Sequence, residues 1–253
     1  MIKFENVSKI YPNGTKGLDN INLTIEQGEF VAIIGTSGAG KSTLIRAINR
    51  LIDITEGSLT VNDVDVSKLR GKELRKFRRS VGMIFQSYNL VPRISVIRNV
   101  MSALVPEMSF LRVLGGVFTK EEKMRALEAL DRVDIAEKAF IRTDQLSGGQ
   151  QQRVSLARTL AQDPDVLLAD EPVAALDPVT AERVMEDFKR INQDLNKTVL
   201  INIHHVELAL EYADRIVAVK KGRIVFDGPV SEVTPDVLNE IYGKEEVKMD
   251  EAV

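Results

Sequence analysis

Gly35-Thr36-Ser37-Gly38-Ala39-Gly40-Lys41-Ser42-Thr43 is the stretch that decides the fold of this 253-residue chain. It follows an apolar run at 30–34 and precedes a helical pattern at 44–48. A buried strand that runs into a glycine-rich turn and then a helix is the arrangement that a phosphate-binding P-loop needs. The glycines let backbone N–H groups point at an anion, and the positive end of the helix adds to that field. We therefore expect residues 35–43 to bind a nucleoside triphosphate, with Lys41 on its β- and γ-phosphates and Ser42 as a Mg²⁺ ligand.

A second half of the triphosphate site is expected where the apolar run at 166–169 ends in Asp170 and Glu171. An acid at the C-terminal end of a buried parallel strand can hold Mg²⁺, and we assign this role to Asp170. The neighbouring carboxylate of Glu171 can orient or deprotonate an attacking water. Together with the P-loop, this pair predicts hydrolysis of the triphosphate.

A further glycine-containing segment, Leu146-Ser147-Gly148-Gly149-Gln150, precedes another helical pattern. Ser147 is a natural N-cap, and the two glycines allow backbone N–H groups to approach a phosphate. One triphosphate does not need two such cradles. We therefore predict a two-fold homodimer in which Ser147, Gly148, Gly149 and Gln150 of each chain close on the nucleotide of the partner.

The bulk composition limits the class of protein. With 44% hydrophobic and 28% charged residues, the chain is typical of soluble globular proteins. A net charge of −3 gives no reason to expect nucleic acid as the main partner, and the absence of cysteine excludes disulfides and thiolate metal sites. No apolar run has the length needed to span a bilayer, and residues 1–5 do not form a signal peptide. We expect a cytoplasmic chain that reaches a membrane only through a partner.

Hydrophobic patterns divide the chain into a core and one insertion. Alternation at 2–7 and 21–25 predicts a small antiparallel sheet ahead of a parallel one. After residue 86 the pattern is mostly helical until strand-like runs return at 166. We predict an α/β fold with a P-loop core at 1–86 and 164–243, a helical subdomain at 87–163, and a frayed charged tail at 244–253.

Two segments allow more than one interpretation. Residues 68–79 hold seven basic side chains, and a solvated helix face is favoured over a nucleic-acid patch because aromatics are not interleaved with them. The apolar stretch from Phe110 to Phe118 is too short to cross a membrane. An amphipathic packing segment is favoured there over a surface that faces a partner.

The order and approximate spacing of these motifs resemble those of the ABC transporter ATPase subunit, over essentially the whole chain up to about residue 243. The resemblance also includes Gln86, the segment Ala174-Ala175-Leu176-Asp177, and His204. It implies a RecA-like P-loop NTPase core that binds and hydrolyses ATP with Mg²⁺. Ala174 stands where many relatives have serine or threonine, which removes one hydroxyl near the dimer seam.

The same resemblance implies roles for individual residues. Tyr11 would stack on adenine, with a turn tyrosine as the alternative. Gln86 would contact Mg²⁺ or the lytic water and sense the membrane partner, and Asp177 would end the loop that couples the two sites. His204 would be the switch that contacts the γ-phosphate; His205 is the alternative, but His204 directly follows an apolar strand. A metal site at this pair is not expected, because adjacent residues on a strand point to opposite faces.

Residues 85–96, 110–119, 121–123 and 224–228 resemble the phosphonate-importer ATPases more narrowly. This resemblance implies uptake of phosphonate or a related phosphorus oxyanion, powered at the cytoplasmic face of the cell membrane. The homodimer would dock under integral membrane permease subunits and work indirectly with a solute-binding protein, without nucleic acid. Methionine, phosphate and amino-acid importers and export or cell-division complexes remain alternatives, and a soluble ABC ATPase acting on ribosomes or DNA is a more distant one.

Overall fold

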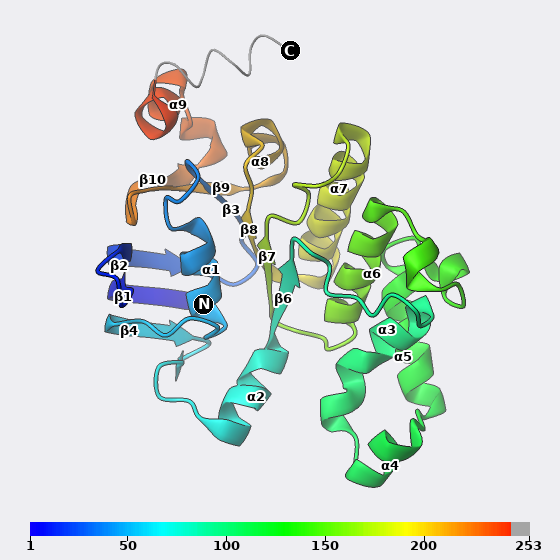
Figure 1. Ribbon diagram of the computed structural model, residues 1–253. Coiled ribbons are helices and arrows are strands. Elements are labelled where there is room, and N and C mark those ends of the chain that lie inside the picture. The colour runs from blue at the N-terminus through cyan, green and yellow to red at the C-terminus, as the bar shows by residue number, and fades with distance from the viewer. Residues whose placement is uncertain (244–253) are drawn as a thin grey trace.

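The computed structural model describes residues 1–243, and a six-stranded sheet forms the centre of the molecule (Figure 1). The strand order is β10-β9-β3-β8-β7-β6, and all strands except the edge strand β10 run parallel. Every residue of β3, β7 and β8 is buried, as expected for parallel strands that are covered on both faces. The strands are β3 Phe30–Ile34, β6 Val81–Phe85, β7 Val166–Asp170, β8 Thr198–Asn202, β9 Arg215–Lys220 and β10 Arg223–Pro229.

One face of this sheet packs against helix α1 and a smaller antiparallel sheet. The order in the smaller sheet is β2-β1-β4-β5. Its apolar side chains and those of α1 share one core with Val31 and Ile33 of β3. The elements are β1 Ile2–Ile10, β2 Lys16–Ile25, α1 Lys41–Ile48, β4 Glu56–Val61, β5 Val64–Asp65 and α2 Gly71–Ser80.

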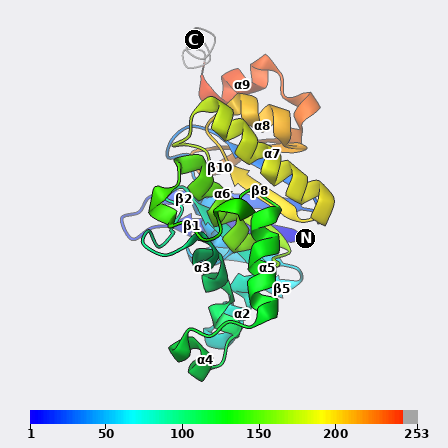
Figure 2. The same cartoon turned by 90° about the vertical axis from the view of Figure 1, so that its right-hand side faces the viewer.

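The opposite face of the parallel sheet is covered by helices, which Figures 1 and 2 show from two sides. Ala32 and Ile34, which alternate with Val31 and Ile33 along β3, share a second core with apolar residues of these helices. The main helices are α3 Val96–Met101, α4 Phe110–Gly115, α5 Lys120–Asp131, α6 Gly148–Leu160, α7 Pro178–Leu195, α8 Val206–Tyr212 and α9 Pro235–Tyr242. The 3-10 helices are η1 Ser102–Glu107, η2 Ala136–Lys138, η3 Thr143–Gln145 and η4 Val230–Glu232.

The helical part between β6 and β7 is tied together by a buried amide. The Asn99 Oδ1 atom accepts a hydrogen bond from the Val91 N–H group at 2.8 Å, and its Nδ2 atom donates to Thr143 Oγ1 at 2.7 Å. The predicted limits of the insertion, 87 and 163, fall after β6 and before β7. The division into core and insertion stays a prediction, and the tail at 244–253 lies outside the described residues.

The interpretation of 110–118 as a packing segment is wrong for most of its apolar side chains. Phe110 and Leu111 are each 78% exposed and Leu114 is 76% exposed, whereas Phe118 packs against the core. The physical reason is the orientation of α4. Its polar residue, Arg112, pairs with Glu122 of α5, so the apolar side of the helix is turned away from the protein.

The basic stretch at 68–79 lies mainly on α2. Only Phe77 of this helix is buried, while Lys72, Arg75 and Lys76 are exposed. The segment is therefore a solvated helix face, attached to the core by Phe77 and by the partly buried Leu69 and Leu74.

Candidate functional site

The P-loop joins β3 to α1, and its course depends on glycine. Gly35 and Gly40 have φ values of 140° and 113°, which side chains rarely adopt. A Cβ atom on Gly35 would lie 2.1 Å from the Val219 carbonyl oxygen, and one on Gly40 would lie 2.4 Å from the Gly17 carbonyl oxygen. Close packing against the neighbouring backbone thus fixes the loop that starts the helix at Lys41.

Lys41 lies inside this loop. The side chain is 4% exposed, and its Nζ atom donates to the carbonyl oxygens of Gly35 at 2.6 Å and Thr36 at 3.0 Å. Burial lowers the pKa of Lys41, while the charges of Glu171 and Asp170 act in the opposite direction. The ammonium group is thus positioned between the P-loop and the two predicted carboxylates.

Ser42 and Asp170, two of the three residues predicted to contact Mg²⁺, are in direct contact. Ser42 Oγ donates to Asp170 Oδ1 at 2.8 Å, and Asp170 is 3% exposed at the end of β7. A hydroxyl and a carboxylate suit Mg²⁺, which in nucleotide sites takes few protein ligands together with phosphates and waters. Within residues 1–243 there is no cluster of three or more His, Asp or Glu that could hold a metal alone. These residues fit Mg²⁺ bound together with a nucleotide.

Two residues that the sequence analysis missed hold Asp170 in place. Arg46 Nε and Nη2 approach Asp170 Oδ2 at 2.9 Å and 2.8 Å. Asn202, fully buried at the end of β8, donates through Nδ2 to Asp170 Oδ1 at 2.7 Å and to Ser42 Oγ at 3.2 Å. Signals for both exist in the sequence: Arg46 lies one helical turn after Ser42, and Asn202 is a polar residue within an apolar strand.

Glu171 and His204, two of the residues predicted to be catalytic, are in contact. Glu171 Oε1 lies 2.8 Å from His204 Nε2. The Glu171 backbone has a left-handed φ of 53°, and its N–H group donates to the Asn202 carbonyl at 3.0 Å, which fixes the turn after β7. His205 instead begins α8, where its carbonyl accepts from the Ala209 N–H group. The structure therefore brings His204 to the carboxylate.

Gln86 and Tyr11 lie at the edges of this site. Gln86 is exposed and follows Phe85, which is in register with Asp170 across β6 and β7. Tyr11 is half-buried, and its hydroxyl lies 3.1 Å from Thr43 Oγ1 at the end of the P-loop. The P-loop also has a partner near the other end of the chain, because the Gly35 N–H group donates to the Tyr242 hydroxyl at 3.2 Å.

The segment at 146–150 lies on the other side of the sheet from the P-loop. Ser147 Oγ accepts from the Gln150 N–H group at 3.4 Å, and Gln150 Oε1 accepts from the Ser147 N–H group at 3.0 Å, so the two form a capping box for α6. The apolar residues of α6 belong to the core on the Ala32 face, whereas those of α1 belong to the core on the Val31 face. Figure 1 shows α1 and α6 on opposite sides of the central strands.

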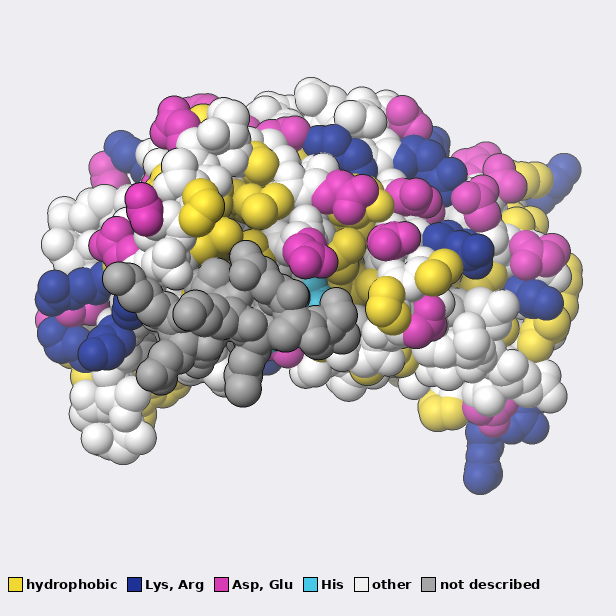
Figure 3. Space-filling model, turned by 90° about the horizontal axis from the view of Figure 1, so that it is seen from above, with side chains coloured by type: hydrophobic (Ala, Val, Ile, Leu, Met, Phe, Trp, Pro, Cys, Tyr) yellow, Lys and Arg dark blue, Asp and Glu magenta, His cyan; other side chains and the backbone are white. Residues whose placement is uncertain are grey.

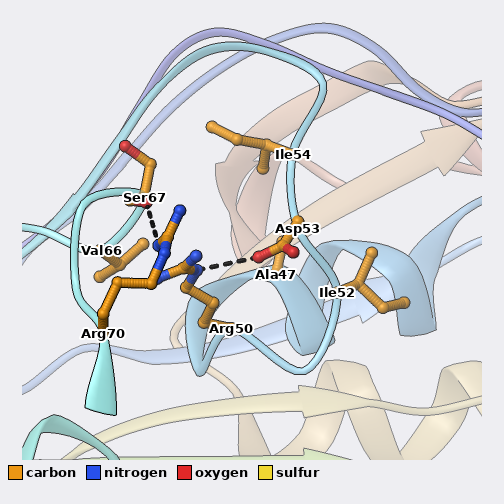
Figure 4. A pocket seen from close by; sticks show the side chains of 8 residues that line it. All are labelled: Ala47, Arg50, Ile52, Asp53, Ile54, Val66, Ser67 and Arg70. Atoms are coloured by element: carbon orange, nitrogen blue, oxygen red, sulfur yellow. Dashed lines mark hydrogen bonds and ion pairs between the residues drawn. The ribbon is translucent and has the colours of Figure 1, made fainter. Parts of the chain in front are cut away.

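A separate cavity of about 180 Å³ lies beyond the C-terminal end of α1 (Figure 4). Two arginines, Arg50 and Arg70, and apolar side chains line it, and Arg50 pairs with Asp53 at 2.9 Å. None of the predicted nucleotide-site residues is among its lining residues.

Comparison with known proteins finds relatives that agree with one another in family and in name. The family model described as ABC transporter matches residues 18–174. A "Phosphonates import ATP-binding protein PhnC" from Lactococcus lactis is 72% identical over 97% of this chain and 100% of its own length. A phosphonates import ATP-binding protein from Halalkalibacterium halodurans is 56% identical over 96% of this chain and 95% of its own length. One from Staphylococcus aureus is 54% identical over 99% of this chain and 97% of its own length.

Solved structures have the same fold. The dimeric ATP-binding cassette MJ0796 in a post-hydrolysis state with ADP and Pi has a TM-score of 0.80 at 37% identity, covering 91% of this chain and 99% of that one. The cbiO1 protein from Clostridium perfringens, part of the ABC transporter complex cbiONQ, has a TM-score of 0.82 at 29% identity, covering 98% and 93%. These matches confirm the predicted P-loop α/β fold and both predicted resemblances. The chain therefore belongs to the ABC transporter family.

Proposed function

We propose that this chain binds Mg²⁺ and ATP and hydrolyses ATP as the ATP-binding subunit of a phosphonate importer. The observation that carries the chemistry is the convergence of Lys41, Ser42, Asp170, Glu171 and His204 at the carboxyl edge of one parallel sheet. The names of the relatives, which are up to 72% identical, support the phosphonate substrate class.

The roles of the side chains follow from their contacts. The P-loop N–H groups and Lys41 would hold the phosphates, and bound Mg²⁺ would neutralise charge on the β- and γ-phosphates. Glu171 would orient the attacking water and accept its proton, while His204, 2.8 Å from Glu171, would hold the carboxylate toward the γ-phosphate. Tyr11 and Gln86 would contact adenine and the lytic water from the two edges of the site.

The proposed assembly is a homodimer with two composite sites. Ser147–Gln150 cannot serve the nucleotide of its own chain if α1 and α6 keep opposite faces of the sheet. A second copy related by a two-fold axis would present this segment to the P-loop. A solved relative is itself described as a dimeric cassette.

We further propose that the dimer binds integral membrane permease subunits at the cytoplasmic face, and acts indirectly with a solute-binding protein. Among residues 1–243, none of the helices is long and apolar enough to span a bilayer. In this proposal the permease subunits hold the dimer at the membrane. Nucleic acid is not part of the proposal.

Glu171→Gln tests the catalytic assignment. The variant keeps the size of the side chain but removes the base, so ATP binding should remain while the hydrolysis rate falls at least about 100-fold. ATP should then trap a dimer that light scattering detects. Glu182→Gln, an exposed site on α7, is the matched control and should behave like the parent protein. A Glu171→Gln protein that stays monomeric with ATP and hydrolyses it at the parent rate would contradict the assignment.

The substrate class needs a separate measurement in cells. A strain that lacks this chain should lose growth on an alkylphosphonate as the phosphorus source and keep growth on phosphate. Growth should return with the parent gene and remain absent with Glu171→Gln. Unimpaired growth on the phosphonate would leave the ATPase assignment standing and point to another importer class.

A further inference from the structure

Helix α4 exposes an apolar face that the nucleotide chemistry does not use. Phe110, Leu111 and Leu114 are each more than 75% exposed, and Val117 just beyond the helix is 59% exposed. Residues 110, 111 and 114 share one side of an α-helix. Several large exposed apolar side chains in one short segment mark an interaction surface rather than ordinary surface variation.

This face is held outward by fixed contacts. Arg112 projects from the opposite side of α4 and pairs with Glu122, which also accepts from the Thr119 N–H group in the capping box of α5. Gly116, which follows the last residue of the helix, has a φ of 60°, and the Val117 N–H group donates to the Arg112 carbonyl at 3.0 Å. The helix is thus attached by its polar side and presents its apolar side to the surroundings.

Basic side chains lie at the same end of the molecule. Figures 1 and 2 both show α2 and α4 at this end. Glu107, the last residue of η1 and three positions before α4, approaches Arg79 of α2 at 3.8 Å and Arg125 of α5 at 3.6 Å, which connects η1 to α2 and α5. Exposed residues Lys72, Arg75 and Lys76 form no ion pair with any residue in the range 1–243.

The opposite end of the molecule carries side chains of both signs. Figure 3 shows that end, where many acidic side chains lie at the surface. Burial raises the pKa of Tyr212 on α8, and the carboxylates of Glu211, Glu186 and Glu182 add to this effect.

We infer that α4 inserts its apolar face into the headgroup boundary of an anionic lipid bilayer, while the basic residues of α2 contact the lipid phosphates. Apolar side chains next to lysine and arginine are the combination by which interfacial helices bind membranes. Anionic lipids attract the exposed basic residues of α2, so they would also orient this end of the molecule toward the bilayer. This lipid contact goes beyond the proposed transport role and does not depend on it.

Vesicle binding by the purified full-length chain tests the inference. The chain should sediment with protein-free phosphatidylglycerol–phosphatidylcholine vesicles, bind pure phosphatidylcholine vesicles about tenfold more weakly, and dissociate at high salt. The triple variant Phe110→Ser, Leu111→Ser, Leu114→Ser should bind the anionic vesicles at least about tenfold more weakly. Because these side chains are exposed, its ATP hydrolysis without membranes should match that of the parent, which shows that it folds.

Matched controls distinguish vesicle binding by this surface from nonspecific hydrophobic or electrostatic binding elsewhere on the protein. Phe140→Ser removes a side chain that is 79% exposed elsewhere in the helical part, and should leave vesicle binding unchanged. The reversal Lys72→Glu with Lys76→Glu should weaken binding about tenfold, whereas Arg132→Glu with Lys138→Glu, after the far end of α5, should have little effect.

Three results would overturn the inference. The first is vesicle binding that the α4 triple variant leaves unchanged. The second is no binding to protein-free vesicles but binding to native inverted membranes that protease treatment abolishes, which would assign the face to a membrane protein. The third is no vesicle binding together with self-association that the triple variant removes, which would assign the face to a second copy of this chain.

Discussion

At the residue scale, the contact between Glu171 and His204 supports the proposal that His204, and not His205, takes part in hydrolysis. Only His204 reaches the carboxylate, at 2.8 Å, while His205 begins α8. His204→Ala should therefore lower the ATP hydrolysis rate at least about 100-fold, because Glu171 and the γ-phosphate lose their common partner. His205→Ala is the matched control in the next position and should keep a rate within about twofold of the parent. Equal losses in both variants would show that the two histidines act through the fold of this loop rather than through chemistry.

Motif spacing was enough to predict two proposed Mg²⁺ ligands that the structure places in direct contact. Ser42 and Asp170 are far apart in sequence, yet each ends or follows a buried strand, so their contact follows from the sheet order. The hydrogen bond from Asn202 to Asp170 could not be predicted from the sequence in this way. The position of Asn202 in the strand is visible in the sequence, but its partner depends on the register between β7 and β8, which pairs it with Asp170.

At the element scale, Asp187 joins α6 to α7. The side chain is 2% exposed, and its oxygens lie 2.9 Å from Arg153 Nε on α6 and 2.9 Å from Arg190 Nη2 on α7. Burial raises the pKa of Asp187 to about 6, although both arginines act to lower it. Asp187 thus fixes α6, which carries the 146–150 segment, to α7, which follows Asp177. Ionising this buried carboxylate is costly.

The raised pKa of Asp187 predicts how stability depends on pH. Between its unfolded value near 3.8 and its folded value of about 6, the folded chain binds more protons, so this group's contribution to the unfolding free energy falls as pH rises. As pH rises through this range, the unfolding free energy of the parent should fall by on the order of 3 kcal/mol relative to that of Asp187→Asn. Urea unfolding at each pH measures both free energies. Asp194→Asn changes an exposed residue on the same helix, and its unfolding free energy should depend on pH as that of the parent does. A difference between parent and Asp187→Asn that stays constant with pH would refute the assignment.

Element types were predicted better than the faces they bury. The strands at β3, β7 and β8 follow from apolar runs of strand length, which only a doubly covered sheet can bury. The stretch at 110–118 has the same apolar character, but nothing in its periodicity says which side meets the protein. The pair Arg112–Glu122 decides this, and such a contact depends on tertiary structure.

At the scale of the whole molecule, two cores on opposite faces of one sheet separate the P-loop from Ser147–Gln150. A complementation experiment tests the resulting composite site. Lys41→Ala and Ser147→Arg should each be nearly inactive alone. Mixed in equal amounts, they should recover activity, because one of the two sites in a mixed dimer combines an intact P-loop with an intact partner segment.

The control for this experiment is a mixture of Lys41→Ala with Glu171→Gln, two changes on the same side of the composite site. No mixed dimer then holds an intact site, so activity should remain at the level of the single variants. Recovery in neither mixture would place both segments on one chain's nucleotide and contradict the proposed assembly.

The central position of β3 also has a consequence for the order in which the chain is made. Its sheet neighbours are β8 and β9, which begin at residues 198 and 215, whereas β3 ends at residue 34. During translation the ribosome must add about 160 further residues before the first of these neighbours exists. The P-loop strand therefore waits unpaired through most of synthesis, and a nascent chain acquires its ability to bind nucleotide only near completion.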